Sequence, residues 1–447
     1  MTYTNEANWS FETKQIHSAW DQDPQTGATS LPIYQTSSYA FENAEQAAAR
    51  FALNELGPIY TRLTNPTTDA VGARVAALEN GVGGLLVSSG QSAAALTILA
   101  LGSAGNNIVA SPSLYGGSVT LLRNTLSRLG IEARFVDDPL NARQWKDLTD
   151  DKTVAYFGES IPNPQGDIFD IETIAVAAHE VGVPLIIDNT VATPYLIRPI
   201  EWGADIVVHS ATKYLGGHGT SIAGVIVDSG NFDYTTQPQR FPQFNEPEAS
   251  YHGIVFGETF GKDGALGANL AFLLRVQTLV NRDLGAVTSP FNAFLIEQGI
   301  ETLSLRVERH VDNALAVAQH LEAHPQVESV NYAGLESSPH HALQLKYAPR
   351  GAGGLLSFVI KGGYDAGRAF ANGLELLPTV ANIGDAKSLV IHPASTTHSQ
   401  LTEDELRHIN IEPGTVRLSI GIENIKDILA DLELGFAAAA KARATDA

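Results

Sequence analysis

Short apolar runs alternate with stretches of helical periodicity between residues 68 and 210. Val71, Val75 and Leu78 recur at helical spacing, and Asn80 followed by Gly81 predicts the end of that helix. Apolar runs of strand length follow at 85–88, 108–110, 133–136, 154–157, 184–187 and 206–208. Further helices are predicted over 90–101, 119–129 and 170–182, the last with Asp170 as its N-cap. This alternation predicts an α/β fold in which helices cover both faces of a mostly parallel sheet.

The pattern changes on both sides of this region. Residues 1–67 carry frequent prolines and glycines and predict an irregular N-terminal arm that contacts a neighbouring subunit. Within the central domain, 68–285, the stretch 228–262 carries seven aromatic residues and three prolines, which predicts an ordered loop packed on the body. A helix over 303–321 and strands over 355–360 and 415–420 predict a smaller C-terminal α+β domain, 286–447.

Composition narrows the classes of function. Hydrophobic residues make up 44% of the chain and charged residues 17%, as in ordinary globular proteins. A net charge of −21 disfavours binding to nucleic acid or to an anionic membrane. No apolar run approaches membrane-spanning length, and the first residues lack a signal-peptide pattern, so we expect a cytoplasmic protein. With 0 cysteines, disulfides, thiolate catalysis and zinc–thiolate sites are excluded.

The strongest chemical signal is Lys213, which lies just past the apolar strand over 205–209. Ser210 and Thr212 precede it, so the segment offers hydroxyl groups for a phosphate beside an amine. A lysine in this setting can form a Schiff base with an aldehyde and can act as a general base once its pKa is lowered. Taken alone, the segment is more often an exposed loop lysine beside capping hydroxyls.

Two further segments suit the same chemistry. Asp188 ends a buried strand, where a carboxylate can keep a pyridine nitrogen protonated and so make the ring an electron sink. Ser89, Gly90 and Gln91 open a helix after a strand, and such a helix N-terminus binds phosphate through its free N–H groups. The simpler explanations are a strand-end aspartate that caps a turn and an ordinary helix N-cap.

Together these segments resemble the Cys/Met-metabolism family of fold-type I pyridoxal-phosphate (PLP) enzymes, from about residue 12 to the C-terminus. The motifs are Ser210-Ala211-Thr212-Lys213-Tyr214, Asp188-Asn189-Thr190 and Ser388-Leu389-Val390-Ile391-His392-Pro393. The resemblance implies a mostly parallel seven-stranded sheet covered by helices, with a smaller C-terminal α+β domain. It also implies a homo-oligomer, a tetramer built from dimers that share active sites.

The resemblance assigns roles to individual residues. It implies that Lys213 carries PLP covalently, that Asp188 meets the pyridine nitrogen, and that Tyr115 stacks on the ring and helps the leaving group depart. It places Asn163 near the ring oxygen, and Arg417, Asn382 and Tyr60 at the substrate. The phosphate ligands it implies are Ser89, Gly90, Gln91, Ser210 and Thr212, with Tyr60 and Arg62 reaching the phosphate from a neighbouring subunit. The alternation of Val416, Arg417 and Leu418 on a strand agrees with an inward arginine, although alone it would suit a surface one.

Three features favour the sulfhydrylase branch of this family. They are the aromatic-rich stretch 228–262, a glycine at position 117 where methionine γ-lyases carry a cysteine, and the segments 382–385 and 395–398. The implied reaction is γ-replacement, in which O-acetyl-L-homoserine and sulfide give L-homocysteine and acetate in methionine biosynthesis. O-Succinylhomoserine sulfhydrylase and cystathionine γ-synthase activities are alternatives, and methionine γ-lyase activity is a more distant one.

Other classes fit less well. A dinucleotide oxidoreductase needs a third glycine where Leu86 stands, and its glycine motif would have to follow a strand. A non-catalytic PLP-binding protein would have no need of the lysine, acid, arginine and phosphate ligands together. His392 with His398, or His340 with His341, lack zincin spacing, so we expect no metal site, and there is no G-x-S-x-G elbow for a nucleophilic serine.

Overall fold

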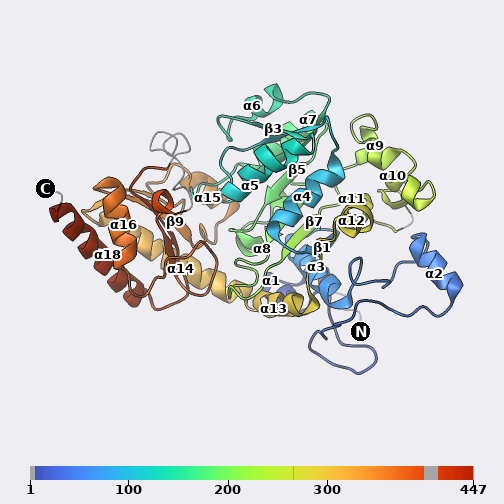
Figure 1. Ribbon diagram of the computed structural model, residues 1–447, viewed down its shortest axis with the longest axis horizontal. Helices are drawn as coiled ribbons and strands as arrows, with labels where there is room; N and C mark the ends of the chain where they lie inside the picture. The colour runs from blue at the N-terminus through green and yellow to red at the C-terminus, as the bar shows by residue number, and fades with distance from the viewer. Residues whose placement is uncertain (1–5, 265, 397–410, 446–447) are drawn as a thin grey trace.

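A seven-stranded sheet lies in the larger unit of the computed structural model, which describes residues 6–264, 266–396 and 411–445 (Figure 1). Its strand order is β1-β7-β6-β5-β4-β2-β3, and every neighbouring pair is parallel except the two that involve β7. The strands are β1 (Gly83–Val87), β2 (Asn107–Ala110), β3 (Glu132–Phe135), β4 (Thr153–Glu159), β5 (Leu185–Asp188), β6 (Ile206–Ser210) and β7 (Gly224–Asp228). The predicted mostly parallel sheet is confirmed, whereas the sequence reading missed β7.

Two hydrophobic cores lie on opposite faces of this sheet, and every strand except β3 contributes side chains to both of them. In β5, Leu185 and Ile187 pack into one core, while Ile186 packs into the other. The first core includes α3 (Pro66–Glu79), α7 (Ile171–Glu180), α13 (Pro290–Ile300) and α14 (Leu303–Ala323). The second includes α4 (Gly90–Leu101), α11 (Ala271–Arg275) and the π-helical turn η6 (Val276–Asn281). Because both faces are covered, the strands read as continuous apolar runs rather than as alternating ones.

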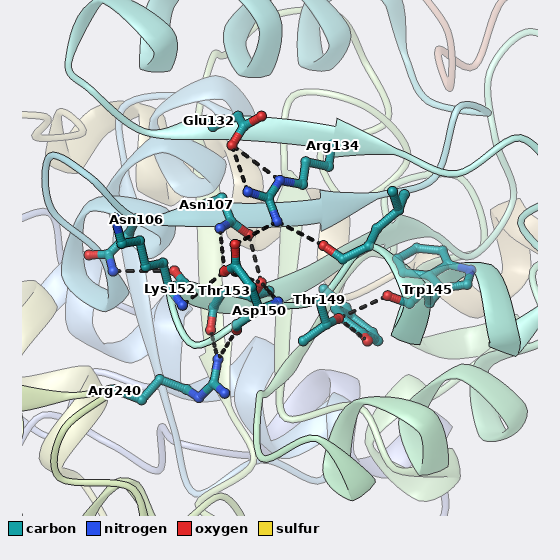
Figure 2. Close-up of polar contacts among 12 residues, drawn as sticks. Asn106, Asn107, Glu132, Arg134, Trp145, Thr149, Asp150, Lys152, Thr153 and Arg240 are labelled. Carbon is teal, nitrogen blue, oxygen red and sulfur yellow. Dashed lines mark hydrogen bonds and ion pairs between the residues drawn. The ribbon is translucent and has the colours of Figure 1, made fainter.

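The aromatic-rich stretch 228–262 packs into the second core, as the sequence predicts. It contains η4 (Tyr234–Thr236), α9 (Pro242–Asn245), η5 (Ala249–Tyr251) and α10 (Phe256–Phe260). The rings of Tyr234 and Phe244 stack with centroids 4.3 Å apart. Arg240 extends from this stretch to the amino-terminal edge of the sheet, where it donates to the carbonyl oxygens of Asp150, at 2.9 Å, and Thr153 (Figure 2).

A second sheet has four antiparallel strands in the order β10-β11-β9-β8. They are β8 (Val327–Asn331), β9 (Leu355–Ile360), β10 (Leu389–Ile391) and β11 (Thr415–Ser419). Together with α14, the helices α16 (Gly363–Gly373) and α18 (Ile425–Thr445) pack on this sheet (Figure 1). The predicted smaller α+β unit is therefore present. It meets the large sheet at that sheet's carboxyl edge, which brings β11 beside the ends of β4, β5 and β6.

One expectation was wrong in detail, and another was confirmed only in part. Residues 1–67 are not irregular throughout, because α1 (Phe11–His17) and α2 (Ala44–Phe51) form there, and the Asn43 side chain accepts the Gln46 N–H to cap α2. Asp170 is the N-cap residue of α7 as predicted, but its side chain makes no capping hydrogen bond. It instead accepts hydrogen bonds from the hydroxyls of Thr173, at 2.7 Å, and Tyr347.

The predicted helix over 119–129 is present as α5 (Gly116–Thr120) followed by the π-helical turn η2 (Leu121–Leu126). The remaining helical segments are η1 (Glu6–Asn8), α6 (Ala142–Asp147), α8 (Thr193–Leu196), η3 (Pro199–Trp202), α12 (Arg282–Leu284), α15 (His341–Tyr347) and η7 (Pro393–Ser395). Across the described ranges, no helix combines the length and the apolar character needed to cross a bilayer.

Candidate active site

A cavity of about 260 Å³ opens at the carboxyl edge of the large sheet. Parallel α/β sheets bind ligands at this edge because strand ends and helix N-termini converge there. The structure brings most of the predicted site residues into the cavity wall: Ser89, Gly90, Gln91, Tyr115, Asn163, Asp188, Ser210, Thr212, Lys213, Asn382 and Arg417. Tyr60 and Arg62 do not line it.

Lys213 lies in the turn between β6 and β7 and projects into this cavity. Its Nζ donates a hydrogen bond to Oδ1 of Asn382, from the smaller unit. The turn is held by Arg306, whose guanidinium donates to the carbonyl oxygens of Tyr214 and Leu215 at 2.8 and 3.1 Å. Burial, assisted by the positive charge of Arg417, lowers the pKa of the Lys213 amine. A lowered pKa leaves more of the lysine as the neutral amine, which is the form that acts as a nucleophile and as a base.

Asp188 ends β5 and is held by the residue two positions later. Oδ1 of Asp188 accepts hydrogen bonds from the backbone N–H of Thr190 at 2.9 Å and from its hydroxyl at 2.5 Å. The same hydroxyl oxygen accepts the Ser210 N–H at 2.8 Å, so Thr190 connects the ends of β5 and β6. Burial raises the pKa of Asp188, while the Thr190 hydrogen bonds oppose that rise.

One end of the cavity is formed by the N-terminus of α4. Ser89 caps this helix by accepting the Ser92 N–H at 3.1 Å, and the N–H groups of Gly90 and Gln91 lie in the first turn, where a helix offers them no acceptor. A Cβ at Gly90 would lie 2.7 Å from Cβ of Ser210, so only glycine lets α4 approach β6 this closely. The Thr212 hydroxyl is directed partly away from the cavity, because it donates to the Ala223 carbonyl at 3.3 Å.

Tyr115 and Asn163 flank the cavity and share one partner. Glu159, the last residue of β4, accepts the backbone N–H of Tyr115 at 2.7 Å and that of Asn163 at 3.4 Å. The Tyr115 side chain is 49% exposed, and a Cβ at Gly117 would lie 2.4 Å from its Cε1 atom. The glycine at 117 therefore makes room for the tyrosine ring.

Arg417 is buried in β11, not on the surface, and only 9% of it is exposed. Its Nη1 donates to Oδ1 of Asn163 at 3.3 Å and its Nη2 to the Asn382 carbonyl at 3.0 Å, while its Nε has no hydrogen-bond partner. Burial lowers the pKa of Arg417 to about 10. Among the described residues, no carboxylate pairs with this guanidinium, so the cavity holds a buried cation with unused donors.

Tyr60 and Arg62 lie in the N-terminal arm, away from the cavity of their own chain. Tyr60 is 43% exposed, and Arg62 donates to the Arg282 carbonyl. Their predicted contact with a neighbouring subunit stays a prediction.

Sequence reasoning missed two cavity residues of chemical interest, Glu159 and Thr190. Thr190 stands two residues after Asp188, a spacing at which a hydroxyl can bond back to the strand end. The signal for Glu159 was its place just after the apolar run 154–157, which forms most of β4. The apolar wall formed by Ile161, Val191 and Ile222 also went unpredicted.

The histidines weighed as metal ligands lie apart from this cavity. His392 bonds to the Ser395 hydroxyl and the Pro413 carbonyl, both at 2.8 Å, and Nδ1 of His341 contacts the Ala333 carbonyl. His398 and Thr397 lie outside the described residues. Within the part of the chain that the structure describes, no three potential ligands gather around a common point.

The cavity fits PLP by its own chemistry. It joins an amine with a lowered pKa, an enclosed carboxyl group and a helix N-terminus with free N–H groups, which match the aldehyde, the pyridine nitrogen and the phosphate. The unpaired Arg417 guanidinium suits the carboxylate of an amino acid.

Comparisons with known proteins agree with this geometry. Residues 12–437 match the model of the family described as Cys/Met metabolism PLP-dependent enzyme. The chain is 52% identical over 430 residues to an O-acetyl-L-homoserine sulfhydrylase from Leptospira meyeri, covering 95% of this chain and 96% of that one. It is 49% identical over 438 residues to an O-acetyl-L-homoserine sulfhydrylase from Corynebacterium glutamicum, covering 97% and 98%.

A solved structure is similar over the same span. The crystal structure of a putative O-acetylhomoserine (thiol)-lyase from Campylobacter jejuni, with N′-pyridoxyl-lysine-5′-monophosphate, superposes with a TM-score of 0.90 at 43% identity. The match covers 96% of this chain and 100% of that one. The chain therefore belongs to the Cys/Met metabolism family of PLP-dependent enzymes.

Proposed function

We propose that this enzyme catalyses γ-replacement, in which O-acetyl-L-homoserine and sulfide give L-homocysteine and acetate. One observation carries the proposal: Arg417, a buried guanidinium without a carboxylate partner among the described residues, faces the same cavity as Lys213. An α-amino acid presents a carboxylate and an amine at one carbon, so these two cations suit that substrate class. The similarity to sulfhydrylases supports the choice of reaction.

PLP would be held by residues of the cavity wall. Lys213 would bind its aldehyde carbon covalently, and Asp188, oriented by Thr190, would accept a hydrogen bond from the pyridine nitrogen. Ser89, Gly90, Gln91, Ser210 and Thr212 would hold the phosphate, and Tyr115 and Asn163 would flank the ring. When bound, PLP supplies an electron sink for the negative charge that develops at the substrate Cα.

The side chains of the cavity wall then have different roles in the reaction. Arg417 binds and orients the substrate carboxylate. The Lys213 amine, with its lowered pKa, moves protons at Cα and Cβ. Asn382, whose Oδ1 accepts from Lys213 Nζ, restrains that amine between transfers. Tyr115 stands at the cavity mouth beside the departing acetate.

Charge in the cavity favours an acetyl donor over a succinyl donor. Within the described wall the cationic side chains are Lys213 and Arg417. Lys213 is needed for the cofactor and Arg417 for the α-carboxylate. A succinyl group would bring a second carboxylate into this cavity, where the described wall offers it no further cation. An acetyl group carries no such charge.

The shape of the N-terminal arm supports shared active sites. The helix α2 projects from the body at the right of Figure 1, and no residue in it is buried. Phe51, Leu56 and Tyr60 of this arm are 60%, 52% and 43% exposed, so a second subunit would cover them. We propose that the arm, 1–67, reaches a neighbouring cavity with Tyr60 and Arg62, and that pairs of such dimers form a tetramer.

Two further sequence-based predictions belong to this proposal. The units are expected to divide at 68–285 for the PLP-binding domain and 286–447 for the C-terminal domain. The location is expected to be cytoplasmic.

The proposal is tested by supplying the purified holoenzyme with sulfide and either O-acetyl- or O-succinyl-L-homoserine. We expect homocysteine and acetate in equal amounts from the acetyl ester, and much slower turnover of the succinyl ester. Borohydride reduction followed by peptide mass analysis is expected to place the pyridoxyl group on Lys213. Absence of homocysteine together with rapid cleavage of methionine would contradict the assigned reaction.

A further inference from the structure

Glu159 is a buried acid in the cavity wall to which the proposed reaction assigns no role. It ends β4 directly beside Asp188 of β5, because the two residues are partners in the parallel strand register. Glu159 is only 4% exposed. Two carboxyl groups therefore lie side by side at the carboxyl edge of the sheet.

The hydrogen bonds of Glu159 lead to both residues that flank the proposed ring position. Oε1 accepts the N–H of Tyr115, the residue before α5, at 2.7 Å. Oε2 accepts the N–H of Asn163, in the loop after β4, at 3.4 Å. One side chain thus joins two segments that are 44 and 4 residues away from it in sequence.

The charges around Glu159 favour its neutral form. Burial, with the adjacent charge of Asp188, raises the pKa of Glu159 well above its usual range. No arginine or lysine of the described chain pairs with either carboxyl group. Two neighbouring carboxyl groups do not both ionise readily, and Asp188 receives two Thr190 hydrogen bonds that favour its charged form. The N–H groups of Tyr115 and Asn163 oppose the rise in the pKa of Glu159 only in part. A neutral carboxyl group keeps a carbonyl oxygen, and part of the acceptor capacity of its hydroxyl oxygen, for these two N–H groups.

We propose that Glu159 is a positioning residue: its uncharged carboxyl group holds the backbone at Tyr115 and Asn163, and so keeps both side chains beside the cofactor ring. Asp188 carries the negative charge that the ring nitrogen requires. This inference rests on the proposed function, since it assumes that the ring lies between Tyr115 and Asn163.

Three substitutions of Glu159 separate the effect of side-chain length from the effect of side-chain charge. Glu159→Gln keeps an uncharged acceptor for the Tyr115 N–H, so we expect near-normal cofactor binding. Glu159→Asp is one methylene shorter, and Glu159→Ala has no acceptor, so in both the two N–H groups lose their partner. For these two we expect the dissociation constant for PLP to rise about tenfold and the near-visible circular dichroism of the bound cofactor to change.

A double-mutant cycle tests whether Glu159 acts through Tyr115. If it does, Glu159→Ala weakens PLP binding much less when Tyr115→Ala is already present than in the wild-type holoenzyme. Glu297→Gln is the matched control, because Glu297 is also buried but pairs with Arg74 between α13 and α3, far from the cavity wall. We expect it to lower thermal stability without changing the cofactor spectrum.

Two results would overturn the inference about Glu159, and a third would overturn the proposed function instead. Loss of PLP binding in Glu159→Gln with retention in Glu159→Asp would show that charge matters instead of reach, and would overturn the inference. Additive effects of Glu159→Ala and Tyr115→Ala would also overturn it. If the wild-type enzyme itself carries no pyridoxyl group on Lys213 or makes no homocysteine, the proposed function fails, and that result does not depend on any Glu159 variant.

Discussion

Asp150 and Asp188 lie at opposite edges of the same sheet, and their surroundings differ. At the amino-terminal edge, Oδ1 of Asp150 accepts from the Asn107 side chain at 2.8 Å and the Lys152 N–H at 2.9 Å, and Oδ2 pairs with Arg134 at 2.9 Å (Figure 2). At the carboxyl edge, Asp188 is bonded by Thr190 and stands beside another acid, Glu159. The first aspartate is charge-paired, whereas the second is not.

The pKa shifts differ in the same way. Although partial desolvation opposes it, the hydrogen bonds from Asn107 and Lys152 and the charge of Arg134 lower the pKa of Asp150. At the carboxyl edge burial dominates: it raises the pKa of Asp188 and Glu159 and lowers that of Lys213 and Arg417. Charged groups that are paired with one another hold the strands together. Buried charged groups without such partners can bind a charged ligand. The sheet places these two kinds of charged group at its opposite edges.

The largest expected effect comes from removing the amine at the carboxyl edge. We expect Lys213→Ala to lower turnover of O-acetyl-L-homoserine by about a thousandfold or more, because both covalent attachment and proton transfer are lost. Lys152→Ala, at an exposed lysine of the amino-terminal edge, is the matched control and is expected to keep normal turnover. Steady-state homocysteine formation measures both. Turnover above about one per cent in Lys213→Ala would assign the proton transfers to another group.

Much of the large sheet could be predicted from sequence because its strands are buried on both faces. The runs that became β4, β5 and β6 are continuous and apolar, and each is followed by a break. The strand β7 was missed because no helix separates it from β6, so the βα alternation gives no cue for it. The helices α1 and α2 were hidden among prolines and glycines that punctuate the arm.

The site was predicted where a residue acts alone and missed where it acts through a neighbour. Asp188 ends one buried strand and Lys213 comes shortly after another, and these local positions are visible in the sequence. Glu159 has its effect through the backbone of Tyr115, 44 residues away, and the burial of Arg417 depends on the smaller unit closing over the strand ends. Such contacts exist only after the chain has folded.

The unpaired cation gives the next largest effect. Arg417→Met removes the proposed carboxylate ligand, so we expect kcat/KM for O-acetyl-L-homoserine to fall about a hundredfold, mainly through KM. Arg134→Met is the control at the amino-terminal edge, where the arginine already pairs with Asp150 and Glu132. It is expected to lower the free energy of unfolding by about 1 kcal/mol and leave KM unchanged. Equal kinetic losses in both variants would erase the contrast between the edges.

Crowding at the cavity mouth predicts a smaller effect. A Cβ at position 117 would lie 2.4 Å from Tyr115 Cε1, whereas a Cβ at position 116 meets nothing within 4 Å. We expect Gly117→Ala to move the tyrosine ring and lower kcat about tenfold, and Gly116→Ala to have little effect. Steady-state kinetics and the near-visible spectrum of the holoenzyme report on both. A Gly117→Ala enzyme with normal kcat would show that the ring position tolerates this displacement.

The smallest effects are on stability, and their signs should be opposite at the two edges. Because the pKa of Asp150 is lowered on folding, its charge stabilises the protein above the unfolded value of about 3.9, and this contribution is lost as pH falls toward the lowered pKa. We expect Asp150→Asn to be less stable than wild type by about 1 kcal/mol at pH 7, with the difference shrinking toward pH 3.

The pKa of Asp188 is raised, so without cofactor its ionisation opposes folding as pH rises above about 3.9. Asp188→Asn apoprotein should therefore equal or exceed wild type in stability at pH 7, and lose that advantage in acid. Urea unfolding of both apoproteins between pH 3 and pH 7 measures the two slopes, and slopes of the same sign would mean that the two aspartates do not differ in the way their contacts indicate.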